Sequence, residues 1–122
     1  MWEEMPANTN QNLRYFGYVH SDGFGVQGSY MADIAALGNA NMAVINSAWT
    51  AEEAAKDLAE AKKYGFKAIV TVHGMFRYKT FGELDSAVLI DDWQGYWDAY
   101  QATVQSYIDD GTIYAFYFDE PR

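Results

Sequence analysis

The residues best suited to chemistry follow an apolar segment near the end of the chain. Phe116, Tyr117 and Phe118 are succeeded directly by two carboxylates, Asp119 and Glu120. Such a segment predicts a β-strand, and in parallel α/β sheets active sites form at the carboxyl ends of the strands. A carboxyl group among aromatic rings is partly desolvated, which raises its pKa and suits it to general-acid catalysis. Glu120 is therefore the candidate catalytic residue.

Three earlier apolar segments are also followed by polar or aromatic residues. His20 follows the first, Asn46 and Trp49 follow the second, and His73 follows the third. Loops after parallel strands share one edge of the sheet, so these side chains are expected to meet the two terminal carboxylates there. The alternative is that they are only polar strand ends, with the Trp49 ring packed under a loop.

The alternation of side chains along a strand assigns these residues to faces of the sheet. Glu120 is expected to share a face with Phe116 and Phe118, and His73 to share one with Thr71. If both faces point into the interior of a barrel, Glu120 and His73 converge. If they do not, Glu120 is a solvated residue at a polar strand end.

Alternating strands and helices must position these side chains. Four segments rich in aromatic and β-branched residues predict strands, and the segments between them have helical spacing of apolar residues. Expected strands cover 14–19, 42–45, 67–72 and 112–118, and expected helices run from about 29 to 38, from 50 to 65 and over 93–108. Gly38, Gly65 and Gly111 are placed to end the three helices.

The second of these helices has the clearest start. Thr50 and Glu53 have the spacing of a capping box, in which each side chain accepts a hydrogen bond from the other residue's backbone N–H. A stripe of Ala54, Leu58 and Ala61 is expected to face the core. The charged residues of this helix are expected to form a solvated face: Glu52, Glu53, Lys56, Asp57, Glu60 and Lys63.

Composition limits the classes of function. The chain has 122 residues, of which 50% are apolar, enough for one domain over 1–122 with residues 1–12 as an N-terminal extension. A net charge of −9 with only 8 Lys and Arg argues against nucleic acid, which is bound through clusters of cations. No apolar run approaches the roughly 20 residues that span a bilayer, so no membrane partner is expected.

Neither a metal nor a cofactor is expected. The chain has no cysteine and only 2 histidines, and the histidines lack the spacing of a zinc-binding helix. The segment Gly23-Phe24-Gly25 lacks the third glycine of a dinucleotide-binding loop and is interpreted as a turn.

Strands that are separated by helices imply parallel crossovers rather than hairpins. The expected fold class is therefore α/β, with a parallel βαβαβαβ unit. The motifs Val72-His73-Gly74 and Tyr117-Phe118-Asp119-Glu120-Pro121 carry a resemblance that implies half of a TIM (β/α)8 barrel for this unit. The first and last strands of such a unit have open edges, which favours self-association into a homo-oligomer.

Two motifs carry a resemblance to a known family. Tyr117-Phe118-Asp119-Glu120-Pro121, together with Val72-His73-Gly74, resembles the fourth and third strands of (β/α)8-barrel glycoside hydrolases of the retaining clan that includes cellulases and mannanases. The resemblance covers the first half of such a barrel. It implies that Glu120 is the acid/base and that His73 contacts the sugar. Asp119 stands where the family has an Asn that donates to the sugar 2-hydroxyl, and an ionised Asp cannot donate.

The resemblance also implies what this chain lacks. The family's nucleophilic Glu lies on the seventh strand of the barrel, which has no counterpart among the four expected strands, so we expect no catalysis by this chain alone. The expected function is a glycoside-hydrolase-like half-barrel that binds an oligo- or polysaccharide through His20, Asn46, Trp49, His73 and Asp119. The alternative is an open α/β interaction or structural module that forms a homodimer and has no sugar chemistry.

Overall fold

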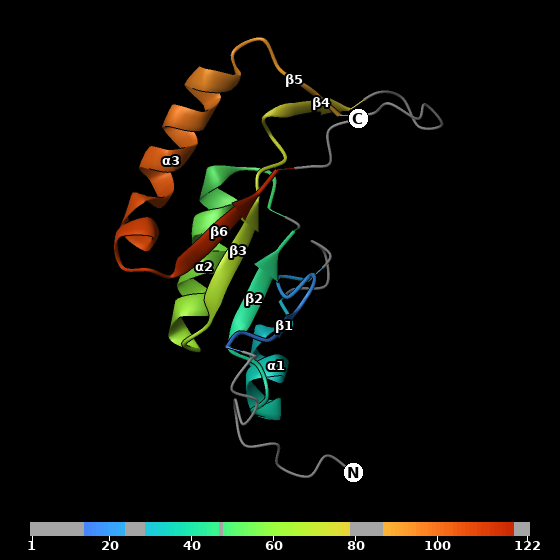
Figure 1. The fold of residues 1–122 in the computed structure, drawn as a ribbon, viewed down its shortest axis with the longest axis vertical. Helices are drawn as coiled ribbons and strands as arrows, with labels where there is room; N and C mark the ends of the chain where they lie inside the picture. Colours follow the sequence, from blue (N-terminus) through green and yellow to red (C-terminus); the bar gives the residue numbers. More distant parts are fainter. Residues whose placement is uncertain (1–13, 24–28, 47, 79–86, 119–122) are drawn as a thin grey trace.

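A computed structural model describes residues 14–23, 29–46, 48–78 and 87–118 (Figure 1). Asp119, Glu120 and the expected N-terminal extension lie outside these residues. The described part of the chain is an α/β fold with a four-stranded sheet and three helices. Its elements, in chain order, are β1 (Gly17–Tyr18), α1 (Met31–Leu37), β2 (Met42–Ile45), α2 (Ala51–Lys63), β3 (Lys67–Thr71), β4 (Phe76–Tyr78), β5 (Ala87–Leu89), α3 (Trp93–Asp109) and β6 (Ile113–Tyr117).

The main sheet is parallel throughout, as the sequence predicted. Its strands lie side by side in the order β1-β2-β3-β6, which is also their order along the chain. Helices connect successive strands of this sheet, and β4 and β5 form a separate antiparallel pair that leads from β3 to α3 (Figure 1). The carboxyl ends of all four strands therefore lie at one edge, which we call the rim.

The helices cover one face of the sheet, where the hydrophobic core lies. Ala43 and Ile45 of β2 and Ala68 and Val70 of β3 are fully buried on this face, against residues such as Leu58 of α2. Small alanines on both the strands and α2 let the helix approach the sheet closely, and the burial of this apolar surface is the main stabilising contribution.

Local signals in the sequence set the helix ends. The Thr50 hydroxyl oxygen accepts from the Glu53 backbone N–H at 3.1 Å, and the Glu53 carboxylate accepts from the Thr50 N–H at 3.2 Å, which confirms the capping box. Gly38, Gly65 and Gly111 follow the three helices with φ of 71°, 73° and 77°. Glycine adopts this left-handed conformation without the steric penalty of other residues, so each helix ends where predicted.

The opposite face of the sheet, which we call the uncovered face, has a different surface. Between Ala68 and Ile69 the register with β6 shifts by one residue, and Tyr114 is the additional residue. Tyr114 is 58% exposed. Its ring meets that of Tyr15, which precedes β1, with ring centroids 4.9 Å apart. Side chains from the two edges of the sheet thus contact each other across this face.

Two expectations about the elements were wrong in extent. The strand expected over 14–19 is shorter and covers only β1. Before β1, the Phe16 N–H donates to the Asn41 side chain and the Phe16 carbonyl accepts from the Asn41 N–H. After β1, the chain turns at Val19. No strand was expected between 72 and 93, but this segment contains β4 and β5. No helix within the described ranges has both the length and the apolar character needed to cross a bilayer.

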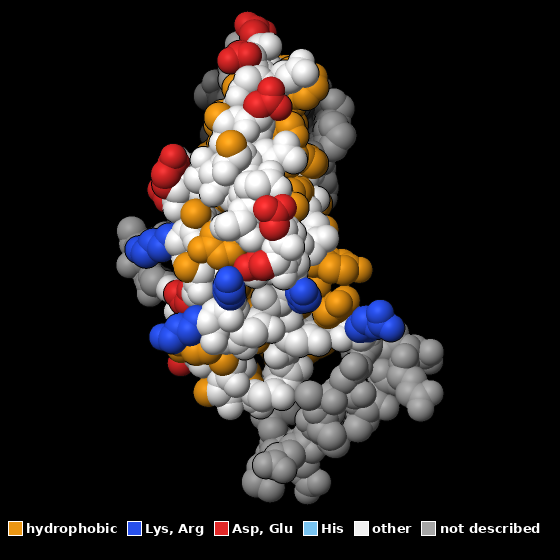
Figure 2. All heavy atoms as spheres, turned by 90° about the vertical axis from the view of Figure 1, so that its left-hand side faces the viewer, with side chains coloured by type: hydrophobic (Ala, Val, Ile, Leu, Met, Phe, Trp, Pro, Cys, Tyr) orange, Lys and Arg blue, Asp and Glu red, His pale blue; other side chains and the backbone are white. Residues whose placement is uncertain are grey.

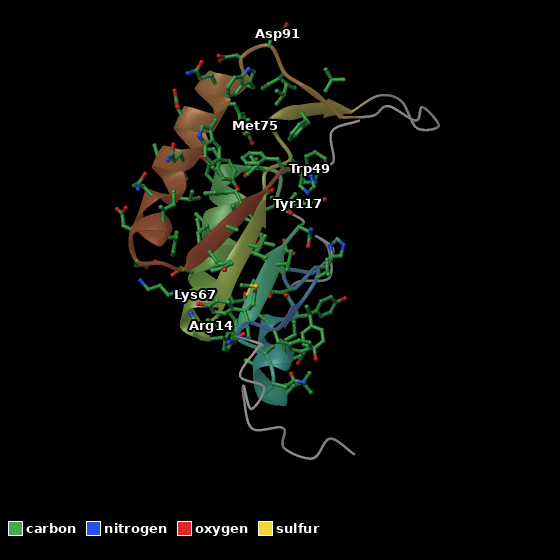
Figure 3. All side chains as sticks on the ribbon, viewed as in Figure 1. Arg14, Trp49, Lys67, Met75, Asp91 and Tyr117 are labelled. Atoms are coloured by element: carbon green, nitrogen blue, oxygen red, sulfur yellow. The ribbon has the colours of Figure 1, made fainter. Side chains whose placement is uncertain are left out.

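Charge is distributed unevenly along the strand direction. Figure 2 shows basic side chains in the lower half of the face that α3 presents, with some acidic side chains among them, whereas the top of this face has acidic side chains and no basic ones. The lower half corresponds to the amino ends of the strands, where Arg14 and Lys67 lie (Figure 3). Lys62 and Lys63, in the last turn of α2, add to this basic end. These four cations thus lie away from the rim.

Candidate functional site

The Asn46 side chain links three strands at the rim. Its Oδ1 accepts from the His20 backbone N–H at 3.0 Å, and its Nδ2 donates to the Thr71 hydroxyl oxygen at 3.2 Å. Thr71 is 1% exposed, so this hydrogen bond satisfies a buried hydroxyl group. Asn46 was predicted from the sequence as a binding residue. The structure gives it a structural role at the predicted place.

His73 lies beside Asn46, as expected for residues that follow neighbouring strands. Its Nε2 is 2.5 Å from the Asn46 carbonyl oxygen. A carbonyl oxygen only accepts hydrogen bonds, so Nε2 is the donor in this contact. The His73 ring is stacked on the Trp49 indole, with centroids 4.7 Å apart and planes inclined by 27°.

Trp49 is held in place although its side chain is 54% exposed. Its backbone N–H donates to the Glu53 carboxylate at 2.7 Å, and its carbonyl oxygen accepts from the Tyr96 hydroxyl at 3.2 Å. Burial and the nearby Glu52 raise the pKa of Tyr96, so this hydroxyl remains a donor. Trp49 is therefore an exposed aromatic ring on a fixed backbone.

Gly74 makes room for the tyrosine that holds Trp49. A Cβ atom at this position would overlap the hydroxyl end of the Tyr96 ring. Because Gly74 has no side chain, the Tyr96 hydroxyl of α3 can reach the Trp49 carbonyl in the loop after β2. Figure 3 shows Trp49 and Tyr117 at the same end of the sheet, with Met75 beyond them.

The loop after β1 is fixed by backbone and side-chain contacts to β2. His20 has a φ of 54°, a left-handed conformation that is uncommon for a residue with a side chain. The next residue, Ser21, is fully buried, donates its backbone N–H to the Val44 carbonyl at 3.0 Å and donates its hydroxyl to the Tyr18 carbonyl at 2.5 Å. These contacts bring His20 to the rim through its backbone.

A pair of carboxyl groups lies behind this loop, on the side of α2. Asp22 is 6% exposed and accepts from the Asn46 backbone N–H at 3.1 Å. Burial, reinforced by the charge of Asp22, raises the pKa of Asp57 of α2 to about 7. Asp57 was expected on a solvated face. That expectation was wrong, because this side of α2 faces the loop after β1.

Phe116 and Phe118 share a face, as expected, but the condition for convergence of Glu120 with His73 is not met. Phe116 is in register with Val70 on the helix-covered face, and its ring meets Trp97 of α3 with centroids 5.0 Å apart. Phe118 also contacts Trp97, at 5.6 Å. Thr71 instead pairs with Tyr117 on the uncovered face. Phe116 and Thr71 therefore do not share a face, and the expected convergence of Glu120 with His73 loses its premise.

The structure thus brings together four of the predicted site residues. His20, Asn46, Trp49 and His73 form one connected group at the rim, while Asp119 and Glu120 lie outside the described residues and stay predictions. In the described ranges there is no group of three His, Asp or Glu side chains that could hold a metal ion. Comparisons with protein-family models, curated proteins and solved structures found no match to this chain.

Proposed function

We propose that the rim binds carbohydrate and that the chain is the first half of a glycoside-hydrolase-like (β/α)8 barrel. The observation that carries this proposal is the exposed Trp49 ring, stacked on His73 and held through both its backbone N–H and its carbonyl oxygen. An exposed indole on a fixed backbone gives a flat apolar surface that is already in its binding conformation, which reduces the entropy lost on binding. The C–H face of a sugar ring packs on such a surface.

Neighbouring groups suit the polar part of a sugar. Asn46 has a second amide hydrogen besides the one that it donates to Thr71. Tyr117 is 42% exposed on the uncovered face of the sheet. Lys62, Lys63 and Lys67 lie toward the opposite end of the sheet, and the acidic Asp22 lies in the loop after β1 at the rim, so a neutral sugar fits the rim better than an acidic one. We therefore propose a neutral oligo- or polysaccharide as the ligand.

The order of the strands supports the half-barrel. Four parallel strands lie in chain order with helices on one face only, as in one half of a closed (β/α)8 barrel. In this proposal Glu120 has the acid/base position and Asp119 lies beside the sugar. Retaining hydrolysis needs a second carboxyl group about 5–5.5 Å away, which a second half of the barrel would supply.

A second candidate function is self-association without sugar chemistry. Large apolar side chains are exposed along both edge strands of the sheet. Phe16 and Val19 at β1 are 43% and 67% exposed, and Tyr114 of β6 is 58% exposed. Parallel strand edges with such side chains favour pairing with another copy. Light scattering tests this candidate, because a closed pair has twice the 13.8 kDa mass of the chain.

Sugar binding is tested by NMR titration with neutral cello- and manno-oligosaccharides at concentrations on the order of millimolar. We expect amide shifts at Trp49 and His73, and binding about tenfold weaker in Trp49→Ala, because stacking on an aromatic ring contributes at this scale. Trp93→Ala is the matched control, since Trp93 is also exposed, at 41%, but lies at the start of α3. Equal binding by the wild type and Trp49→Ala would refute the proposed site.

A further inference from the structure

Glu53 of α2 accepts one hydrogen bond that its place in the helix does not require. In a capping box, the carboxylate at this position accepts from the N-cap backbone N–H, and Glu53 accepts from the Thr50 N–H at 3.2 Å. The same oxygen, Oε2, also accepts from the Trp49 N–H, at the shorter distance of 2.7 Å. Trp49 precedes the N-cap residue, so helix capping alone does not account for this second bond.

The second bond joins α2 to the backbone of an exposed aromatic residue. Trp49 donates its N–H to Glu53 of α2, and its carbonyl oxygen accepts from the Tyr96 hydroxyl of α3 at 3.2 Å. Hydrogen bonds to a carboxylate are shorter and stronger than those between neutral groups. Two helices therefore hold the backbone of Trp49, and α2 supplies the shorter of the two bonds.

The orientation of the Trp49 ring decides which of its faces is open to a ligand. The His73 ring is stacked on one face of the indole, with centroids 4.7 Å apart. A sugar ring can pack only on the opposite face, so the site offers a single stacking surface. A shift of the Trp49 backbone would separate the indole from His73 and turn this surface away from its present direction.

We propose that Glu53 is a positioning residue of the carbohydrate site and holds the Trp49 ring against His73 through the Trp49 backbone N–H. This inference rests on the proposed function, in which the sugar packs on Trp49. The Glu53 carboxylate then has two roles. Its bond to the Thr50 N–H caps α2, and its bond to the Trp49 N–H fixes the ring before the ligand binds. A ring that is already fixed loses less conformational entropy on binding.

Two matched variants of the full chain separate these roles. Glu53→Ala removes both bonds to the carboxylate, whereas Thr50→Ala removes only the hydroxyl that accepts from the Glu53 N–H and keeps the bond to Trp49. Each variant breaks the capping box, so we expect both melting temperatures to fall by on the order of 5 °C. Only Glu53→Ala should bind cello- and manno-oligosaccharides more weakly, by about threefold. Glu53→Gln keeps an oxygen acceptor and should restore most of the affinity.

The stacked histidine gives a measurement that needs no ligand. The chain has only 2 histidines, so NMR can follow the ring protons of His73 with His20 as the reference. The indole ring current shifts the His73 protons, and this shift should decrease in Glu53→Ala but persist in Thr50→Ala and Glu53→Gln.

Two results would overturn the role of Glu53 and leave the carbohydrate proposal intact. One is an unchanged His73 shift in Glu53→Ala. The other is a wild type that binds the sugars while Glu53→Ala and Thr50→Ala bind them equally well. Absence of sugar binding by the wild type would instead refute the carbohydrate proposal, and the role of Glu53 in binding with it.

Discussion

The two ends of the sheet use polar residues in different ways. At the amino end, each side chain joins two neighbouring segments. Lys67 donates to the Gly111 carbonyl at 2.6 Å, Lys62 pairs with Asp110 at 2.9 Å, and the Asn41 side chain accepts from the Phe16 N–H and donates to the Arg14 carbonyl, both at 2.9 Å. At the rim, the Asn46 side chain links the end of its own strand to the ends of β1 and β3, and its carbonyl oxygen contacts a stacked histidine.

Stability explains the contacts at the amino end, but it does not fully explain the contacts at the rim. The amino-end contacts of Lys62 and Lys67 close the turns after α2 and α3, which is a sufficient structural reason for them. The rim contacts also fix the backbone of an exposed tryptophan, although fixing an exposed side chain contributes little to stability. In (β/α)-type folds, the carboxyl end is the functional end and the amino end is the stability end. The following variants test whether that division holds here.

Asn46→Ala is expected to have the largest effect on stability. The substitution leaves the buried Thr71 hydroxyl and the His20 backbone N–H without this partner, at a cost of about 2–3 kcal/mol. Lys67→Met is the comparison at the amino end. Water can solvate the Gly111 carbonyl there, and the expected loss is about 1 kcal/mol. Urea denaturation of both variants measures the difference. Equal losses would contradict a denser network at the rim.

Two glycine variants compare the two ends of the sheet. Their effects on the free energy of unfolding should be similar, but only one of them should change the rim. Gly65→Ala places a side chain at a φ of 73° with open space around it, and should cost about 1 kcal/mol. Gly74→Ala pushes Tyr96 from the Trp49 carbonyl and loses that hydrogen bond, also about 1 kcal/mol.

Only Gly74→Ala should change the surroundings of Trp49. We expect its indole N–H resonance to shift in this variant and to stay in place in Gly65→Ala, as measured by ¹⁵N-resolved NMR. A Trp49 resonance that is unchanged in both variants would mean that Tyr96 does not position the ring.

The parts of the fold that were predictable from the sequence depend on short-range signals. Thr50 and Glu53 are three residues apart, and the glycines after the helices act through their own backbone conformation. The alternation of strands and helices was sufficient to place Asn46 and His73 at one edge of a parallel sheet. In each case, the deciding interaction is local or follows from topology alone.

The parts that could not be predicted depend on pairings between distant residues. Asp57 lies 35 positions after Asp22, and the charge pattern of α2 gives no sign that the Asp22 charge acts on Asp57. The register shift at Ala68 and Ile69 is a property of two paired strands, so alternation within each strand alone could not show that Phe116 and Thr71 lie on opposite faces. The hairpin of β4 and β5 was missed because each of its strands has only three residues.

The smallest expected effect is at the amino end, and it depends on pH through Asp110. Hydrogen bonds from Lys62 and Thr112 lower the pKa of Asp110 to about 2. The unfolded state therefore binds the proton more readily, and the stabilisation by Asp110 is present above about pH 4 and is lost as the pH falls toward about 2. Asp110→Asn should be slightly less stable than the wild type at about pH 5.

Thermal unfolding in acid, with Asp98→Asn as the control for net charge, measures whether that small difference disappears. It should also shrink in roughly 1 M salt, because ions screen this exposed pair over a few ångströms. A difference that persists in acid would show that Asp110 acts through its shape rather than its charge. If it disappears, acid weakens the amino end through Asp110, whereas the Asn46 side-chain contacts at the rim join uncharged groups and stay in place.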